Sequence, residues 1–302
     1  MSAEFQKEIL SWYKKNGRHT LPWRRKVNQS AYRILVSELM LQQTQVDRVI
    51  PKYSAFLKNF PTARALAQAK VADVLKAWQG LGYNRRALYL QRACQVVQKE
   101  YGARFPRTAQ ELEKLPGVGP YTARAVSVFA FNNPEVLIET NVRRVFIYFF
   151  FTSSVIARSP QATKQSRDRH VFPLRENPRD DRIVSDAELM PLIEKYLYKK
   201  DPRMWYSALM DYGALAMEGI LNPNRKSKHY IKQSKFEGSK RYVRAHIVRY
   251  LLEHKKASSQ EILKSCAGNP YLEKYAHELG DILDALTREG CMVFHKGKWH
   301  II

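Results

Sequence analysis

The sequence predicts a mostly α-helical protein that ends in a small winged-helix-like module. Apolar residues recur every three or four positions through most of the first 220 residues, which is the period of helices packed against a core. We find no alternating strand pattern before residue 290. Residues 291–302 (CMVFHKGKWHII) then predict a hairpin that turns at Lys296–Gly297.

Proline, glycine and capping residues indicate where the helices begin and end. Ser30 can cap the helix after the turn TLPWRR, and Thr44 with Asp47 resembles a capping box for a helix at 45–58. Further helices are expected at 64–78, 85–100, 108–115, 121–131, 141–151, 187–198, 203–217, 241–254 and 274–289, with a short one opening at Ser258–Ser259. Residues 157–186 are charged and contain three prolines, which predicts a long loop.

These elements divide into domains by composition. We expect one helical domain at 25–132, a second that joins 1–24 to 133–221, a basic linker at 222–240 and the winged-helix-like module at 241–302. The linker carries Arg225, Lys226 and Lys228, which are candidates for phosphate contacts. A solvated linker without a ligand is the alternative.

The net charge indicates the kind of partner. Fifty-one Lys and Arg residues against 28 Asp and Glu give +23, which favours a polyanion such as nucleic acid over a ribosome-associated or membrane-surface role. No apolar run is long enough to span a membrane, and the N-terminal segment lacks the apolar core of a signal peptide, so we expect a cytoplasmic protein. Three cysteines without CxxC spacing exclude a four-thiolate metal site.

Glu38 is the most informative residue, because it places a carboxylate within the helical run ILVSELMLQQTQV at 34–46. Ile34, Leu35, Leu39 and Leu41 are expected to face the core, whereas Gln42 and Gln45 are expected on the side of Glu38. An acid flanked by amides suits binding of a flat heterocycle and transfer of a proton. The alternative is a surface glutamate on an amphipathic helix.

A second signal is LPGVGPYTARA at 115–125, which predicts a helix–hairpin–helix. Gly117, Val118 and Gly119 allow a tight turn whose backbone N–H groups can bind a phosphate at the start of the next helix. The alternative is an ordinary turn between helices. A third signal is LIETNVRRV at 137–145, where Glu139 precedes a helix that Thr140 or Asn141 could cap. Glu139 could stabilise a positively charged sugar, or could only cap its helix.

Together these strings resemble the helix–hairpin–helix (HhH-GPD) DNA glycosylases, and within them the MutY-type adenine glycosylases. The likeness covers residues 8–220 and includes LPWR with Arg24 (21–24), SELMLQQTQV (37–46), VIPKY (49–53), LKAWQGLGY (75–83), LPGVGPYTA (115–123) and ALMDYGAL (208–215). It implies a two-domain helical glycosylase fold, with the catalytic cleft between the two helical domains, and a monomer that binds double-stranded DNA near the nucleoid.

The resemblance also implies roles for individual residues. Glu38 would protonate N7 of an extruded adenine and later activate water. Tyr121 stands where lyase-competent relatives have a lysine, so base removal without strong AP-lyase activity is expected. Gln43 and Tyr83 would wedge into the duplex, and Asn141 would orient the second acid. Gln42, Arg24 and the hairpin would complete the DNA contacts.

Four departures from the family pattern stand out. The second carboxylate is Glu139 instead of an aspartate, and Asn84 replaces a frequent aromatic residue. AMEGILNPNRKSKHY at 216–230 lacks the cysteines that hold an iron–sulfur cluster in most relatives. Residues 241–302 are too short for the usual 8-oxoguanine-sensing domain.

From these observations we expect no cofactor apart from a possible monovalent cation at the hairpin. The leading function is a monofunctional DNA glycosylase that removes adenine mispaired with 8-oxoguanine or guanine. The alternatives are a glycosylase for uracil, thymine in a G:T mispair or hypoxanthine, and a lesion-binding protein without turnover.

Overall fold

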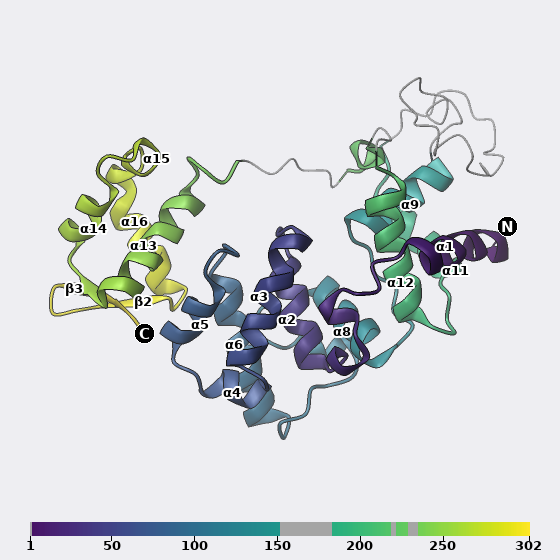
Figure 1. Cartoon of the computed structure of the whole chain (residues 1–302), viewed down its shortest axis with the longest axis horizontal. Coiled ribbons are helices and arrows are strands. Elements are labelled where there is room, and N and C mark those ends of the chain that lie inside the picture. The colour runs from purple at the N-terminus through teal and green to yellow at the C-terminus, as the bar shows by residue number, and fades with distance from the viewer. Residues whose placement is uncertain (1, 152–182, 219–221, 229–234) are drawn as a thin grey trace. The chain divides into compact units, whose positions relative to one another are not determined.

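The structure is a computed structural model that describes residues 2–151, 183–218, 222–228 and 235–302 (Figure 1). The chain forms two compact units, one of residues 1–21 with 124–232 and the other of residues 22–123 with 233–302. Helices dominate both units, which confirms the predicted fold class. The domain boundaries expected from the sequence stay predictions.

The first part of the second unit is a bundle of short helices around an aromatic core. Its elements are η1 (Pro22–Arg24), η2 (Lys26–Asn28), α2 (Ala31–Leu41), α3 (Val46–Asn59), α4 (Ala63–Gln68), α5 (Val71–Trp78), α6 (Arg85–Glu100), α7 (Ala109–Leu112) and the start of α8 (Pro120–Phe131). Ser30, Thr62 and Thr108 cap α2, α4 and α7 through their hydroxyls, as serine and threonine do at helix N-termini. Phe56 and Trp78 are fully buried, and their rings meet edge to face at 5.7 Å.

Three sequence predictions in this part are wrong. α2 ends at Leu41, so Gln45 does not continue the face of Glu38 and instead occupies the N-cap position of α3. Thr44 makes no capping box, because its hydroxyl donates to the Gln42 and Leu81 carbonyls. The helix expected at 64–78 is two helices, α4 and α5, because the backbone at Ala69 is extended.

The first unit is built around the ring of Phe5. Its elements are α1 (Ser2–Asn16), the rest of α8, α9 (Thr140–Phe151), α11 (Asp186–Lys195), α12 (Pro202–Asp211), the π-helical turn η4 (Tyr212–Ala216) and η5 (Pro223–Lys226). Phe5 meets five aromatic rings at centroid distances of 5.0 to 5.7 Å, those of Phe146, Phe149, Phe150, Tyr196 and Trp205. Residues 157–182 of the loop expected at 157–186 lie outside the described residues, and residues 183–186 lie within them.

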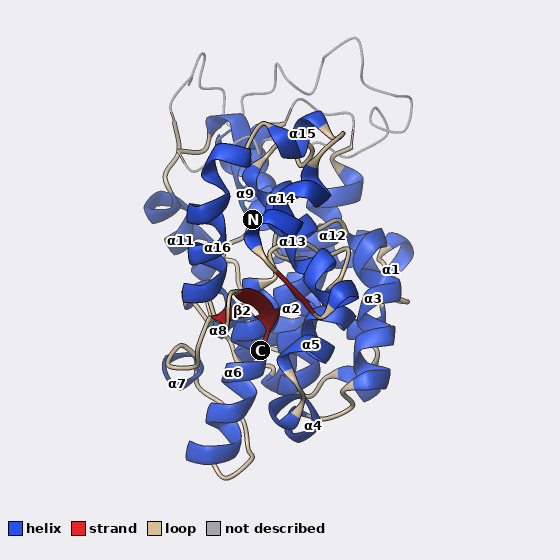
Figure 2. Ribbon diagram, turned by 90° about the vertical axis from the view of Figure 1, so that its left-hand side faces the viewer, coloured by secondary structure: helices blue, strands red, loops and turns tan. Residues whose placement is uncertain are grey.

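The C-terminal part of the second unit has the helices and sheet of a winged helix. It consists of α13 (Lys240–His254), β1 (Lys256–Ala257), α14 (Ser259–Cys266), α15 (Pro270–Glu273), η6 (Ala276–Glu278), α16 (Leu279–Arg288), β2 (Met292–His295) and β3 (Lys298–Ile301). The strands, which are red in Figure 2, form an antiparallel sheet in the order β1-β3-β2. The hairpin at Lys296–Gly297 is confirmed, and both residues have positive φ. β1 lies before residue 290, where the sequence shows no alternating pattern, because a strand of two residues is too short to show a period.

The acidic residues near α16 bind the basic helix α13. Lys240 pairs with Glu278, and the Arg244 Nη2 lies 2.5 Å from the Glu289 Oε2. Glu278 and Glu289 are thus paired with basic residues of α13 inside the same module. Among the described residues, every helix is too short or too polar to cross a bilayer.

Candidate catalytic and DNA-binding site

Glu38 lies near the end of α2 and is half-buried. Ile34, Leu35 and Leu39 are at most 3% exposed, which confirms most of the predicted apolar face, whereas Leu41 is half-buried. A carboxylate on such a helix keeps access to a ligand while the backbone beneath it is held by packing.

The end of α2 is tied to the start of α8. The Gln42 Nε2 donates to the Thr122 Oγ1 at 3.2 Å, across 80 residues of sequence. Tyr121 is the neighbour of Thr122 and is half-buried. The structure therefore joins the helix of Glu38 to the helix of Tyr121, and Thr122 is a residue that the sequence interpretation missed.

The hairpin between α7 and α8 has the backbone that its glycines predict. Gly117 has φ of +75°, and a Cβ there would lie 2.4 Å from the Tyr89 Cβ. A Cβ at Gly119 would meet no atom within 4 Å, so that side of the backbone is open to close approach. Val118 is 4% exposed, so this residue is buried at the turn.

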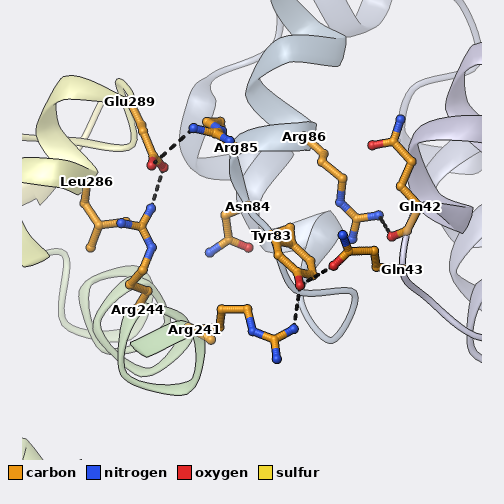
Figure 3. A pocket seen from close by; sticks show the side chains of 11 residues that line it. Gln42, Gln43, Tyr83, Asn84, Arg85, Arg86, Arg241, Arg244, Leu286 and Glu289 are labelled. Atoms are coloured by element: carbon orange, nitrogen blue, oxygen red, sulfur yellow. Dashed lines mark hydrogen bonds and ion pairs between the residues drawn. The ribbon is translucent and has the colours of Figure 1, made fainter. Parts of the chain in front are cut away.

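Gln43 and Tyr83 occupy two turns that meet. Both have a left-handed backbone, with φ of +54° and +48°, which is uncommon for residues other than glycine and marks a constrained position. The Tyr83 hydroxyl donates to the Gln43 Oε1. The two residues expected to wedge into DNA are thus in contact with each other (Figure 3).

Arg86 holds these two turns together, and no pattern in the sequence predicted this role. Its Nη1 donates to the Leu39 and Gln42 carbonyls at 2.6 and 2.5 Å, and its Nη2 donates to the Leu81 and Gly82 carbonyls, both at 3.0 Å. The side chain is buried, and burial lowers the pKa of its guanidinium to about 10.

Replacing Arg86 with methionine is expected to lower the free energy of unfolding by about 3 kcal/mol, because it leaves buried carbonyls without their donor. The matched control is Arg85→Met, which removes the same charge from an exposed neighbour and is expected to change the free energy by about 0.5 kcal/mol or less. Urea unfolding of both variants measures the difference, and equal midpoints would contradict the role given to Arg86.

Glu139 caps α9 with its own side chain. Its Oε1 accepts from the backbone N–H groups of Asn141 and Val142 at 2.7 and 2.8 Å, and its Oε2 accepts from the Asn141 Nδ2 at 3.3 Å. The cap predicted from Thr140 or Asn141 is therefore wrong, since a glutamate is long enough to reach both amides. Asn141 and Glu139 do lie together.

Burial raises the pKa of Glu139 above its ordinary value. The hydrogen bonds from Val142 and Asn141 and the charge of Arg143 oppose this rise in the pKa. The positive end of the α9 dipole acts in the same direction. Such a carboxylate changes its charge at a pH closer to neutrality than an exposed glutamate does.

The surroundings of Asn141 are tightly packed. A Cβ at Gly213 would lie 2.6 Å from the Asn141 carbonyl oxygen, so only glycine fits there in the π-helical turn. Arg144 on α9 donates to the Gly213 carbonyl at 2.9 Å and to the Met217 carbonyl at 2.7 Å. This packing fixes the first turn of α9, on which Glu139 depends.

Residues 222–228, which belong to the expected basic linker, pack against α9. The Asn224 Nδ2 donates to the Thr140 carbonyl at 3.1 Å, and the Lys226 Nζ donates to the Phe151 carbonyl at 3.4 Å. Arg225 and Lys228 are exposed. Lys226 therefore bonds to the protein, whereas Arg225 and Lys228 present their side chains to solvent.

Arg24 ends the turn η1, beside the buried Trp23, whose ring meets that of Tyr53 at 5.6 Å. The turn is held by the Asn28 Nδ2, which donates to the Pro22 carbonyl at 2.7 Å. Arg24 is thus on a fixed backbone within the second unit.

The residues present do not fit an iron–sulfur cluster ligated by four thiolates. The chain has three cysteines, and Cys94, Cys266 and Cys291 are all buried in the second unit. Burial raises the pKa of each thiol, which disfavours the thiolate that a metal needs. In the described ranges no group of three His, Cys, Asp or Glu residues could hold a metal ion. The monovalent cation at the hairpin stays a prediction.

Part of the sequence is similar to known DNA repair proteins. Residues 36–170 match the model of the HhH-GPD superfamily of base excision DNA repair proteins. The chain is 51% identical over 138 residues to an adenine DNA glycosylase of Mycolicibacterium smegmatis, which is 46% of each chain. It is 43% identical over 148 residues to the adenine DNA glycosylase of Homo sapiens, covering 47% of this chain and 27% of the relative. The match thus spans less than half the length of these relatives.

Two solved structures share the fold. A thermostable thymine-DNA glycosylase superposes with a TM-score of 0.55 at 25% identity, covering 71% of this chain and 86% of the other. A non-covalent complex of endonuclease III with DNA superposes with a TM-score of 0.51 at 18% identity, over 71% and 86% of the two chains.

Proposed function

Because residues 36–170 match the model of the HhH-GPD superfamily of base excision DNA repair proteins, we propose that this chain is a DNA glycosylase that removes adenine mispaired with 8-oxoguanine or guanine. The observation that carries the proposal is the identity of 51% over 138 residues to an adenine DNA glycosylase. The glutamate at position 38 supports it, since the sequence resembles the adenine enzymes at that position. Double-stranded DNA is the proposed partner, and the net charge of +23 fits it.

In the proposed reaction, Glu38 donates its proton to N7 of an adenine that has left the base stack. The bond between C1′ and N9 breaks, and its electron pair leaves with the base. The sugar becomes positively charged, and the carboxylate of Glu139 stabilises that charge. Water then bonds to C1′ and gives its proton to the Glu38 carboxylate, which restores the acid.

The hairpin and the turns would hold the duplex. We propose that the open backbone at Gly119 approaches a phosphate, with Gly117 and Val118 shaping the turn. Gln43 and Tyr83 would fill the space that the adenine vacates, and Gln42, Arg24, Arg225 and Lys228 would make further contacts to the DNA. Lys226 already bonds to the Phe151 carbonyl and would contribute charge.

Tyr121 lacks an amine, so the proposed enzyme removes the base without cutting the strand. Tyr121→Lys is expected to add strand cleavage, because an amine can attack C1′ and form a Schiff base. Borohydride would trap that intermediate as a protein–DNA adduct on a gel. Tyr121→Arg adds the same charge without a nucleophilic amine and is expected to give no adduct. If the lysine variant gives none either, Tyr121 does not face the sugar.

Labelled duplexes test the proposed function. Purified protein is incubated with A:8-oxoguanine, A:G, U:G, T:G and hypoxanthine:T duplexes, followed by alkali. Cleavage of the two adenine duplexes is expected. A second candidate is excision of thymine from T:G, favoured by the superposition on a thymine-DNA glycosylase. Cleavage of T:G without cleavage of the adenine duplexes would replace the proposal by that candidate.

Binding of these duplexes without any cleavage would identify a lesion-binding protein without turnover, which would also overturn the proposal.

A further inference from the structure

A pocket of about 420 Å³ lies where helix α13 meets the turns of Gln43 and Tyr83 (Figure 3). Both sides belong to the same compact unit. Its volume is in the usual range for small-molecule sites, and its lining is rich in amides and guanidinium groups. The proposed function already uses Gln42, Gln43 and Tyr83 of this lining, but it gives no part to α13.

Arg241 on α13 binds the side chain expected to wedge into DNA. Its Nη1 donates to the Tyr83 hydroxyl at 2.5 Å, and its guanidinium carbon lies 5.3 Å from the centre of the Tyr83 ring. Because the same hydroxyl donates to Gln43, the three side chains form one hydrogen-bonded row. Such a row places Arg241 beside whatever Tyr83 and Gln43 touch.

The position of Arg241 is fixed by the next turn of its helix. The Arg244 Nη2 lies 2.5 Å from the Glu289 Oε2, and the Glu289 carbonyl accepts from the Arg92 Nη2 of α6 at 2.9 Å. A Cβ at Gly290 would lie 2.3 Å from the same Arg92 nitrogen, so the module packs closely on α6 at this point. α13 is therefore anchored beside the turns.

We propose that Arg241 reads the base that is left unpaired on the opposite strand when the target base leaves the stack, and that this base is guanine. The planar fork of arginine matches the two adjacent acceptors of guanine, O6 and N7. The site adjoins the two wedge residues and contains further amide donors in Gln43 and Asn84. The C-terminal module thus contributes to opposite-base recognition. This inference rests on the proposed function.

The test is a cycle that removes either the arginine or the opposite base. Dissociation constants are measured for duplexes that carry 2′-fluoroadenosine, in which the fluorine disfavours positive charge at C1′ and so blocks excision. The residue opposite is either guanine or an abasic spacer. Arg241→Ala is expected to weaken binding to the guanine duplex about tenfold and to the spacer duplex less than about twofold.

Arg249→Ala is the matched control, since Arg249 lies on α13, is exposed and is not among the residues that line the pocket. It removes the same charge and is expected to weaken both duplexes equally. Arg241→Lys keeps the charge but loses the fork, so it is expected to resemble Arg241→Ala on the guanine duplex. It also serves if the alanine variant fails to fold.

Equal weakening of both duplexes by the Arg241 variants would show a phosphate contact and overturn the inference, as would no weakening at all. Excision of unmodified adenine by the wild type is measured in parallel. If the wild type excises adenine but the Arg241 variants show no loss of binding specific to the guanine duplex, only the inference about Arg241 is refuted. If the variants show that loss of binding but the wild type does not excise adenine, the proposed function is refuted and Arg241 remains a base contact.

Discussion

Glu38→Gln is expected to reduce single-turnover excision of adenine by about 10³-fold, because an amide cannot deliver the proton that the leaving base needs. The affinity for duplex DNA is expected to change by less than about twofold, since the phosphate contacts that supply most of the affinity remain. The fold is expected to persist, because Glu38 is half-buried on a helix whose apolar face is made by other residues.

The matched control is Glu100→Gln, which makes the same chemical change at an exposed residue at the end of α6. It is expected to leave the excision rate within about twofold of the wild type. A Glu38→Gln variant with wild-type turnover would show that another group supplies the proton.

Changes at Glu139 are expected to separate its charge from its role as a cap. Glu139→Gln keeps an oxygen that can accept from the Asn141 and Val142 amides but loses the negative charge. We expect excision to fall by about 10²-fold, in the range measured when one stabilising group is removed from a transition state. Single-turnover rates and a melting curve measure the two effects separately. A large loss of stability with an unchanged rate would leave Glu139 as a cap only.

Glu139→Asp is expected to preserve or raise the excision rate. Aspartate is a strong N-cap residue, so α9 keeps its start, and the carboxylate moves toward the place it has in the family that the sequence resembles. The shift is about 1.5 Å, one methylene. A loss of rate would show that the packed surroundings of Asn141 and Gly213 suit the longer side chain.

The acid side of the pH–rate profile tests the same carboxylate. Because burial raises the pKa of Glu139, the wild-type rate is expected to fall at a pH above the ordinary value of 4.5 as the charge is lost. The raised pKa also means that the folded state holds this proton more tightly than the unfolded state. Its contribution to stability is therefore present below 4.5 and is lost as the pH rises through the folded-state pKa. Both effects should be absent in Glu139→Gln.

The elements with strong local signals could be predicted from the sequence. α6 matches the expected 85–100, and the hairpin at Lys296–Gly297 turns where the sequence places it. Gly117 has a positive φ, which favours glycine, and the string LPGVG already predicts a tight turn at this place. Each of these depends on contacts within a few residues, so spacing and turn chemistry are sufficient.

Contacts across long stretches of sequence could not be predicted. Arg86 bonds to carbonyls 44 to 47 residues away, and an arginine in an amphipathic helix gives no sign of burial. Arg241 meets Tyr83 across 158 residues. The end of α2 was missed for a related reason, because Arg86 donates to the Gln42 carbonyl at the turn that ends the helix. In each case a tertiary hydrogen bond determines the local structure, and the local sequence pattern does not show it.

The central claim is that Glu38 protonates N7 of adenine. The most direct test uses a substrate in which another atom replaces N7. Single-turnover excision is measured for wild type and Glu38→Gln on duplexes with adenine or 7-deazaadenine, which has carbon in place of N7. We predict that the excision rate of the wild type is about 10³-fold lower on the analogue than on adenine. The rate of Glu38→Gln is expected to be the same on both duplexes, because this variant has no proton to donate to N7. Wild-type excision of 7-deazaadenine at the rate of adenine would contradict the account.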